Sequence, residues 1–155
     1  MEDLAAQERV VSRERALHQF LILYRPWAKS PLVSLRPAVP GLQDQAFVSN
    51  LAVALPHREE ATIVVSRFRS LPRVGEARIG ARFFALTGAR VVRPPAEWRG
   101  APLCLEGEAD LKHVRGTLYV GAHGMRTSAS ALHWAAETFE MTVLPVRIRD
   151  PYLYH

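Results

Sequence analysis

Leu105-Glu106-Gly107-Glu108-Ala109-Asp110 places three carboxylates at alternate positions, in a stretch whose pattern predicts a β-strand. Successive side chains of a strand point to opposite faces, so Glu106, Glu108 and Asp110 are expected on one face. Like charges held this close repel one another unless a cation lies among them. The stretch therefore predicts either a cation-binding strand or a solvated edge strand with an alternating pattern.

The residue types around this stretch favour an organic cation over a metal ion. No His, Asn or further Asp stands nearby at a spacing that would complete the oxygen shell of a hard metal. A guanidinium group is planar, carries five N–H donors and pairs with carboxylates through two hydrogen bonds at once. The sequence thus indicates a guanidinium ligand, with no metal and no cofactor expected.

The charge of the chain comes almost entirely from arginine. The 155 residues carry a net charge of +5, and 18 of the 20 basic residues are arginines. They stand singly along the chain, without a basic run or a basic–aromatic motif of the RNA-binding kind. This distribution predicts a solvated surface and no nucleic-acid partner.

The length and apolar content suit one globular domain without a membrane segment. Hydrophobic residues make up 48% of the chain, enough for a core. No apolar run approaches the ~20 residues that a membrane helix needs. The N-terminus, with Glu2, Asp3 and Glu8, lacks the basic start and apolar centre of a signal peptide. These features, with a single cysteine, predict a cytoplasmic protein that does not bind membranes.

The first 44 residues are predicted to form a helix and a proline-rich connection. A helical stripe of apolar residues runs over 3–21, with Asp3 as its cap, although 21–24 is also compatible with the start of a strand. Four prolines then keep 25–41 extended and irregular.

The rest of the chain repeats one order of elements, which predicts an α/β fold built of two ββαβ units within one domain. The first unit, residues 45–95, is predicted to contain strand 46–55, strand 61–66, helix 75–87 and strand 89–92. The second, residues 96–155, is predicted to contain strand 103–114, strand 117–121, helix 128–139 and strand 142–148. Asn50 and Asp110 take comparable places in the two units, as do the basic turns at Arg73 and Arg126.

Four motifs in this order resemble the guanidino-group modifying enzymes, the group of arginine deiminase, arginine dihydrolase, dimethylarginine dimethylaminohydrolase and amidinotransferase. The motifs are Phe47-Val48-Ser49-Asn50, the acidic stretch 105–110, the turn 121–127 with Arg126-Thr127, and Asp150-Pro151-Tyr152-Leu153-Tyr154-His155. The resemblance implies a pentein fold, an α/β propeller of ββαβ units around a substrate channel. This chain would supply its first units and leave the propeller incomplete.

The resemblance also implies roles for individual residues. Glu106 and His155 take the catalytic positions, and Glu108 is near enough to exchange with Glu106 if the register shifts. Substrate-binding positions fall on the following residues: Asn50, Asp44, Glu108, Asp110 and Arg126. The implied chemistry is attack of a cysteine thiolate on the guanidinium carbon of arginine or a related compound, with His155 moving protons and carboxylates holding the substrate.

The chain departs from the family at the nucleophile. Its one thiol, Cys104, precedes Glu106 on the predicted strand and is not in the family's nucleophile position, so it is expected to be a small core residue among acids. We therefore expect a partial hydrolase or amidinotransferase that is inactive alone. The alternative is a non-catalytic module that pairs with another chain to complete the propeller, or that self-associates through its uncapped edges.

Overall fold

The computed structural model describes residues 12–29, 34–42, 44–150, 152, 153 and 155, and it divides the chain into two units, residues 1–37 and 38–155. The first unit contains helix α2, Arg13–Trp27. Its N-cap is Ser12, whose hydroxyl accepts a hydrogen bond from the backbone N–H of Arg15. The predicted helix over 3–21 is thus helical from residue 13, and its cap at Asp3 lies outside the described residues. The alternative strand at 21–24 is wrong, because these residues continue α2.

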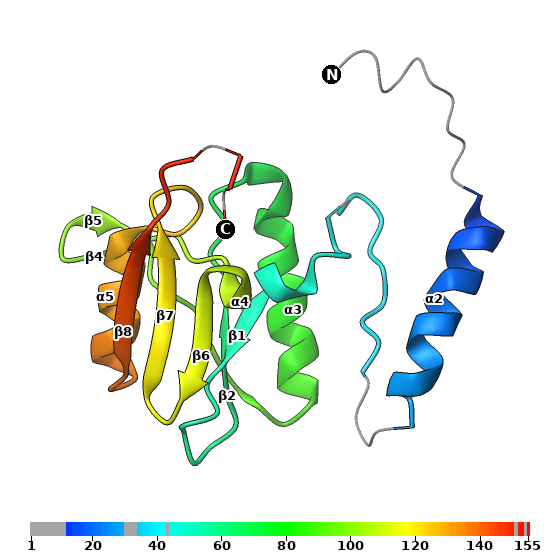
Figure 1. The fold of residues 1–155 in the computed structure, drawn as a ribbon, viewed down its shortest axis with the longest axis horizontal. Helices are drawn as coiled ribbons and strands as arrows, with labels where there is room; N and C mark the ends of the chain where they lie inside the picture. The colour runs from blue at the N-terminus through cyan, green and yellow to red at the C-terminus, as the bar shows by residue number, and fades with distance from the viewer. Residues whose placement is uncertain (1–11, 30–33, 43, 151, 154) are drawn as a thin grey trace. The chain divides into compact units, whose positions relative to one another are not determined.

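The second unit begins with the first predicted ββαβ repeat (Figure 1). A 3-10 helix, η1 (Val48–Asn50), precedes strand β1 (Ala52–Ala54), so the predicted strand 46–55 is shorter than expected. Strand β2 (Thr62–Val65) pairs with β1 in antiparallel fashion and with β3 (Arg90–Val92) in parallel. A short 3-10 turn, η2 (Leu71–Arg73), and helix α3 (Val74–Leu86) make the crossover. The helix ends where Gly88 takes a φ of 83°.

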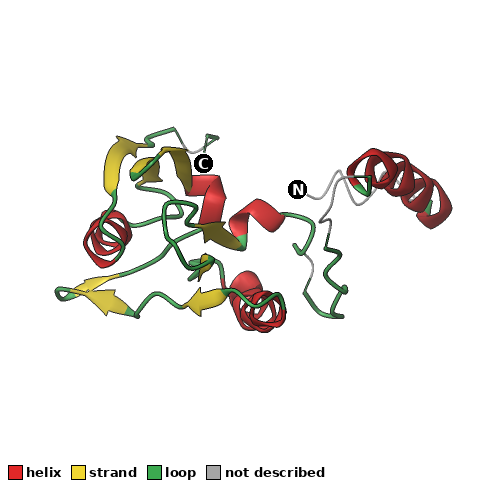
Figure 2. Cartoon of the chain, turned by 90° about the horizontal axis from the view of Figure 1, so that it is seen from below, coloured by secondary structure: helices red, strands yellow, loops and turns green. Residues whose placement is uncertain are grey.

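The same order then recurs. Strand β6 (Leu111–Arg115) pairs antiparallel with β7 (Leu118–His123), which pairs in parallel with β8 (Thr142–Arg147). The crossover is helix α5 (Ala129–Thr138), capped by the Ser128 hydroxyl. Helices α3 and α5 lie apart, each beside its own sheet (Figure 2). The predicted repetition of element order is confirmed.

Two elements between the repeats were not predicted. Strands β4 (Glu97–Trp98) and β5 (Ala101–Pro102) form a hairpin whose two turn residues, Arg99 and Gly100, both have positive φ. Helix α4 (Gly107–Asp110) occupies part of the predicted strand 103–114, so that strand prediction is wrong. Only its last residues, from Leu111, form a strand.

One hydrophobic core joins the two repeats. It packs residues of β1 and β2 against β6, β7 and α5, with Val53, Val64, Leu111, Tyr119, Leu132 and Trp134 among its members. Tyr119 is completely buried, and its hydroxyl meets His57 Nδ1 at 2.8 Å. Trp134 packs edge-on against Phe139, as expected of a packing residue. Within the described residues, every helix is too short or too polar to cross a membrane.

Candidate active site

The two repeats meet at Gly107, the first residue of α4. Its φ is +52°, and a Cβ placed there would lie 2.6 Å from the carbonyl oxygen of Ser49 and 2.7 Å from that of Ala52. Both atoms belong to the backbone, which cannot rotate away. The absence of a side chain therefore lets the acidic stretch of the second repeat lie directly against η1 of the first.

The helical turn changes which acids share a face. Residues four apart lie on one side of a helix, so Glu106 at the N-cap and Asp110 point together and are 1% and 2% exposed. Glu108 lies on the other side and is exposed to solvent. The expectation that all three carboxylates share one face is wrong, and the pair that remains is buried.

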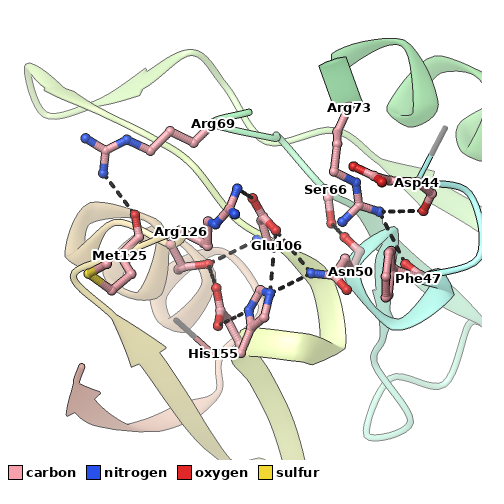
Figure 3. Close-up of polar contacts among 12 residues, drawn as sticks. Asp44, Phe47, Asn50, Ser66, Arg69, Arg73, Glu106, Met125, Arg126 and His155 are labelled. Carbon is pink, nitrogen blue, oxygen red and sulfur yellow. Dashed lines mark hydrogen bonds and ion pairs between the residues drawn. The ribbon is translucent and has the colours of Figure 1, made fainter. Parts of the chain in front are cut away.

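Asn50 bridges Glu106 and His155 (Figure 3). The Asn50 side-chain nitrogen lies 3.1 Å from Glu106 Oε2 and 2.9 Å from His155 Nε2. An amide nitrogen carries two hydrogens, so it donates to both partners. The main chain of Asn50 is fixed in turn, because the buried Ser66 hydroxyl donates to its carbonyl oxygen.

Asp110 holds the other nitrogen of the histidine. His155 Nδ1 lies 3.0 Å from Asp110 Oδ1, and the Thr127 hydroxyl donates to Asp110 Oδ2 at 2.6 Å. A histidine with a buried carboxylate behind one nitrogen presents its other nitrogen in a defined direction. The structure thus brings Asn50, Glu106, Asp110 and His155 together from three separate segments.

A hollow of about 310 Å³ opens in front of this group. It is lined by the following residues: Asp44, Phe47, Asn50, Ser70, Arg73, Glu106, Arg126 and His155. Glu106 Oε1 is buried and has no hydrogen-bond partner within the described residues, and Arg126 Nη1 lies 3.8 Å away, beyond hydrogen-bond reach. A buried carboxylate oxygen without a donor is costly, so this atom indicates a place for a ligand with N–H groups.

Arg73 shapes one wall of the hollow. Its guanidinium donates from Nε and Nη2 to the two carboxylate oxygens of buried Glu76, each at 3.0 Å, and it lies 4.4 Å from the centre of the Phe68 ring. Nη2 also donates to the main-chain oxygens of Phe47 and Asp44 at 3.3 and 3.4 Å. Arg73 therefore fixes the segment that leads into η1, a role that the sequence reading of a basic turn missed.

A second hollow of about 500 Å³ adjoins the first through Arg126, and three arginines line it. Arg69, Arg126 and Arg147 line it together with His123 and the half-buried Cys104. Arg69 donates to the carbonyl oxygen of Met125 at 2.9 Å, which holds it beside the Arg126 turn (Figure 3). Cys104 thus shares a hollow with basic side chains, and its main chain bonds Ser128.

Of the predicted site residues, five line the first hollow: Asp44, Asn50, Glu106, Arg126 and His155. Asp110 lies behind His155, and Glu108 faces solvent away from the hollow. Among the described residues, no three His, Cys, Asp or Glu side chains gather closely enough to hold a metal ion. Sequence reasoning missed Arg69 and Arg147. Arg69 was open to detection, because it follows β2 as Arg126 follows β7.

Comparison with known proteins gives relatives of one chemical class, although no protein-family model matches the sequence. The chain is 28% identical over 144 residues to the bifunctional arginine dihydrolase/ornithine cyclodeaminase AgrE of Nostoc sp., which covers 93% of this chain and 19% of AgrE. It superposes with a TM-score of 0.79 and 26% identity on the product-bound N-terminal domain of ArgZ, an arginine dihydrolase from the ornithine-ammonia cycle in cyanobacteria. That match covers 93% of this chain and 50% of the ArgZ domain.

A more distant likeness concerns the fold alone. A dimethylarginine dimethylaminohydrolase solved as an adduct with S-methyl-L-thiocitrulline matches with a TM-score of 0.72 and 19% identity, over 90% of this chain and 52% of the enzyme. The chain thus spans about half of each matched domain. The comparisons confirm the resemblance to the guanidino-group modifying enzymes and the α/β class, a partial pentein fold with open sheets.

Proposed function

We propose that this chain supplies the guanidinium-binding and acid–base part of a hydrolase site of the arginine dihydrolase type. The observation that carries the proposal is Glu106 Oε1, a buried carboxylate oxygen without a hydrogen-bond donor that faces a hollow large enough for a side chain. A guanidinium in this hollow would supply the N–H groups that Arg126 is too distant to donate. The 28% identity to AgrE supports arginine, or a related guanidino compound, as the substrate.

The other residues of the hollow divide between binding and proton transfer. Asn50 stands beside Glu106, where it would orient the guanidinium. His155 keeps Nε2 toward the hollow while Asp110 holds Nδ1, so it would move protons to and from the reacting group. Arg126, with Arg69 and Arg147 in the adjoining hollow, would pair with the carboxylate of an amino-acid substrate. Asp44, on the opposite wall, would contact the rest of the substrate.

The nucleophile of the reaction would come from outside this sequence. Cys104 lines the arginine-rich hollow and does not line the hollow that contains Glu106 and His155. A thiolate must approach the guanidinium carbon to attack it, and a cysteine in the other hollow is not placed to do so. We therefore expect no release of ammonia, urea or ornithine when the purified chain is incubated with arginine. Release that Glu106→Gln abolishes would contradict this part of the proposal.

Binding of L-arginine to the chain tests the main claim. NMR titration should show shifts at Asn50 and Glu106, and Glu106→Gln should weaken binding on the order of tenfold or more, the usual loss for one charge-assisted pair. Glu108→Gln is the matched control, because Glu108 lies on the same turn with its side chain exposed. If both substitutions weaken binding equally, the affinity for L-arginine depends on the overall charge of the chain, and the ligand does not bind at Glu106.

A second candidate function, an interaction module, has its own support on strand β8. Leu144 and Val146 are 51% and 50% exposed, on the face of the strand opposite Val143, which packs on the core. An exposed apolar strand surface favours association with another chain or a second copy. Light scattering should then report oligomers that Val146→Lys reduces. A monomer at high concentration would count against self-association.

A further inference from the structure

Thr127 is a buried threonine beside the candidate catalytic residues. Thr127 follows Arg126 and precedes Ser128, the cap of α5, and only 2% of its surface is exposed. Its hydroxyl oxygen lies 3.0 Å from the backbone nitrogen of Glu106 and 2.6 Å from Asp110 Oδ2. One hydroxyl therefore touches both buried acidic residues of the α4 turn.

The direction of these two hydrogen bonds is fixed by their chemistry. A backbone N–H only donates, so Thr127 Oγ1 accepts from Glu106. The single hydroxyl hydrogen of Thr127 is then left for the Asp110 carboxylate. With Oδ2 engaged, Asp110 turns Oδ1 to His155 Nδ1 at 3.0 Å, where it accepts the Nδ1 proton.

The remaining bonds close a ring. In an imidazole that carries its proton on Nδ1 alone, Nε2 has the lone pair and accepts from the Asn50 amide nitrogen at 2.9 Å. The second hydrogen of that amide goes to Glu106 Oε2 at 3.1 Å. If the Asn50 side-chain amide were turned around, its oxygen would face Glu106 Oε2, and two acceptors would repel each other. Starting from the backbone of Glu106, the chain of donors and acceptors thus returns to the side chain of Glu106.

We propose that Thr127 is a positioning residue, whose hydroxyl orients Asp110 so that neutral His155 carries its proton on Nδ1 and keeps Nε2 as the proton acceptor. The meaning of Nε2 for catalysis rests on the proposed function, whereas the tautomer does not. Thr127 also ties the backbone of Glu106 to the same hydroxyl. The carboxylate that would hold the guanidinium and the histidine that would move protons are therefore held in register by one side chain.

The tautomer of His155 in the ligand-free chain tests this proposal. Two-bond ¹H–¹⁵N correlation spectra of the neutral ring distinguish Nδ1–H from Nε2–H. We expect Nδ1–H in the wild-type chain and in Thr127→Ser, which keeps the hydroxyl. Thr127→Val has nearly the same shape without the hydroxyl, and it should lose the dominant Nδ1–H signature, as should Asp110→Ala, which removes the acceptor. An amide spectrum of each variant checks that the chain is folded.

Several outcomes would overturn the proposal. A wild-type His155 with its proton on Nε2 would do so, and so would a folded Thr127→Val chain with an unchanged Nδ1–H signature. If Thr127→Val does not fold, the wild-type hydroxyl proton decides the matter. It should be protected from exchange with water and show a cross-relaxation contact to the Glu106 amide proton, and rapid exchange would refute the assignment.

The result is separable from the proposed function. A chain that shows the expected tautomer changes but does not bind L-arginine would retain the positioning role and refute the guanidinium site. Arginine binding that depends on Glu106, together with a His155 tautomer that Thr127→Val leaves unchanged, would support the guanidinium site and refute the positioning role.

Discussion

The two ββαβ repeats hold equivalent residues with a hydroxyl group, but in different ways. In the first repeat, Ser66 follows β2 and donates to the main-chain oxygen of Asn50. In the second, Thr127 follows the turn after β7 and donates to the side-chain carboxylate of Asp110. Ser66 stands directly after its strand and fixes a backbone, whereas Thr127 stands just before the cap of α5 and directs a charge. A repeated fold therefore supplies comparable places, and single side chains decide what each place does.

The charged groups near the junction are also paired differently in the two repeats. The turn after β2 carries Arg69 and the buried Arg73, whereas the turn of α4 carries the buried acids Glu106 and Asp110. Arg73 makes two hydrogen bonds to Glu76, whereas Glu106 meets Arg126 at 3.8 Å and keeps Oε1 without a hydrogen-bond donor among the described residues. Both repeats contribute charged groups to the hollow, Arg73 from the first and Glu106 with Arg126 from the second.

The largest expected effect comes from forcing the repeats apart at Gly107. Gly107→Ala adds a Cβ against the backbone of Ser49 and Ala52 and imposes a strained positive φ. We expect a loss of about 4 kcal/mol or more in the free energy of unfolding, or no folded protein. Gly116→Ala is the control, because its φ of +48° carries the same strain in open space. Chemical denaturation should separate the two, and equal losses would show that the contact is unimportant.

The next prediction concerns the buried ion pair between Arg73 and Glu76 in the first repeat. Glu76→Gln leaves the Arg73 guanidinium buried without its counter-charge, which should cost about 3 kcal/mol. The matched substitution Glu137→Gln breaks an exposed pair with Arg99 and should change stability by less than about 1 kcal/mol. Urea unfolding curves of both variants check this difference. Similar curves would contradict a structural role for the buried pair.

Much of the order of helices and strands was predictable from the sequence, because local residue patterns determine it. The apolar periodicity of α3 and α5, the β-branched run of β2 and the stop at Gly88 are local signals, and the structure follows them. The α4 turn was not predictable in this way. Its alternating acids fit a strand, and only the contact of Gly107 with the distant Ser49 and Ala52 selects a turn.

The candidate site shows the same limit. Glu106, Asn50 and His155 were found through motifs, whereas Arg73 and Thr127 act through partners that are distant in sequence. Thr127 contacts residues 17 and 21 positions away, and Arg73 bonds main-chain oxygens 26 and 29 positions away. Spacing in the sequence carries no signal for such contacts, because they depend on how the repeats pack.

A smaller effect, visible only at alkaline pH, comes from the core that joins the repeats. Burial, and then the charge of Glu108, raises the pKa of Tyr119 from 10.0 to about 12. Tyr119 therefore keeps its phenol proton to a higher pH in the folded state than in the unfolded state. Its contribution to the free energy of unfolding is fully present below pH 10 and is lost as the pH rises from 10 to 12. The free energy of unfolding should fall by about 2 kcal/mol over that range. Tyr119→Phe should remove most of this slope, and an unchanged slope would refute the assignment.

The smallest expected effect compares the two hydroxyls directly. Ser66→Ala removes the bond to the Asn50 carbonyl and should cost about 1 kcal/mol, with no change in the tautomer of His155. Thr127→Val removes two buried bonds, one of them to a carboxylate, so it should cost more, about 2 kcal/mol, and should alter the tautomer. Thermal unfolding gives the first quantity and ¹⁵N spectra give the second. If Ser66→Ala changes the His155 tautomer as strongly as Thr127→Val does, the tautomer is not set specifically by the bond from Thr127 to Asp110.

A crystal structure of this chain with L-arginine would show where the guanidinium binds. We expect it in the hollow between the repeats, with one N–H group about 3 Å from Glu106 Oε1, a second group beside Asn50, and the substrate carboxylate toward Arg126. Arginine bound in that hollow with its carboxylate against Glu106, or found only elsewhere on the chain while the hollow stays accessible, would contradict this expectation.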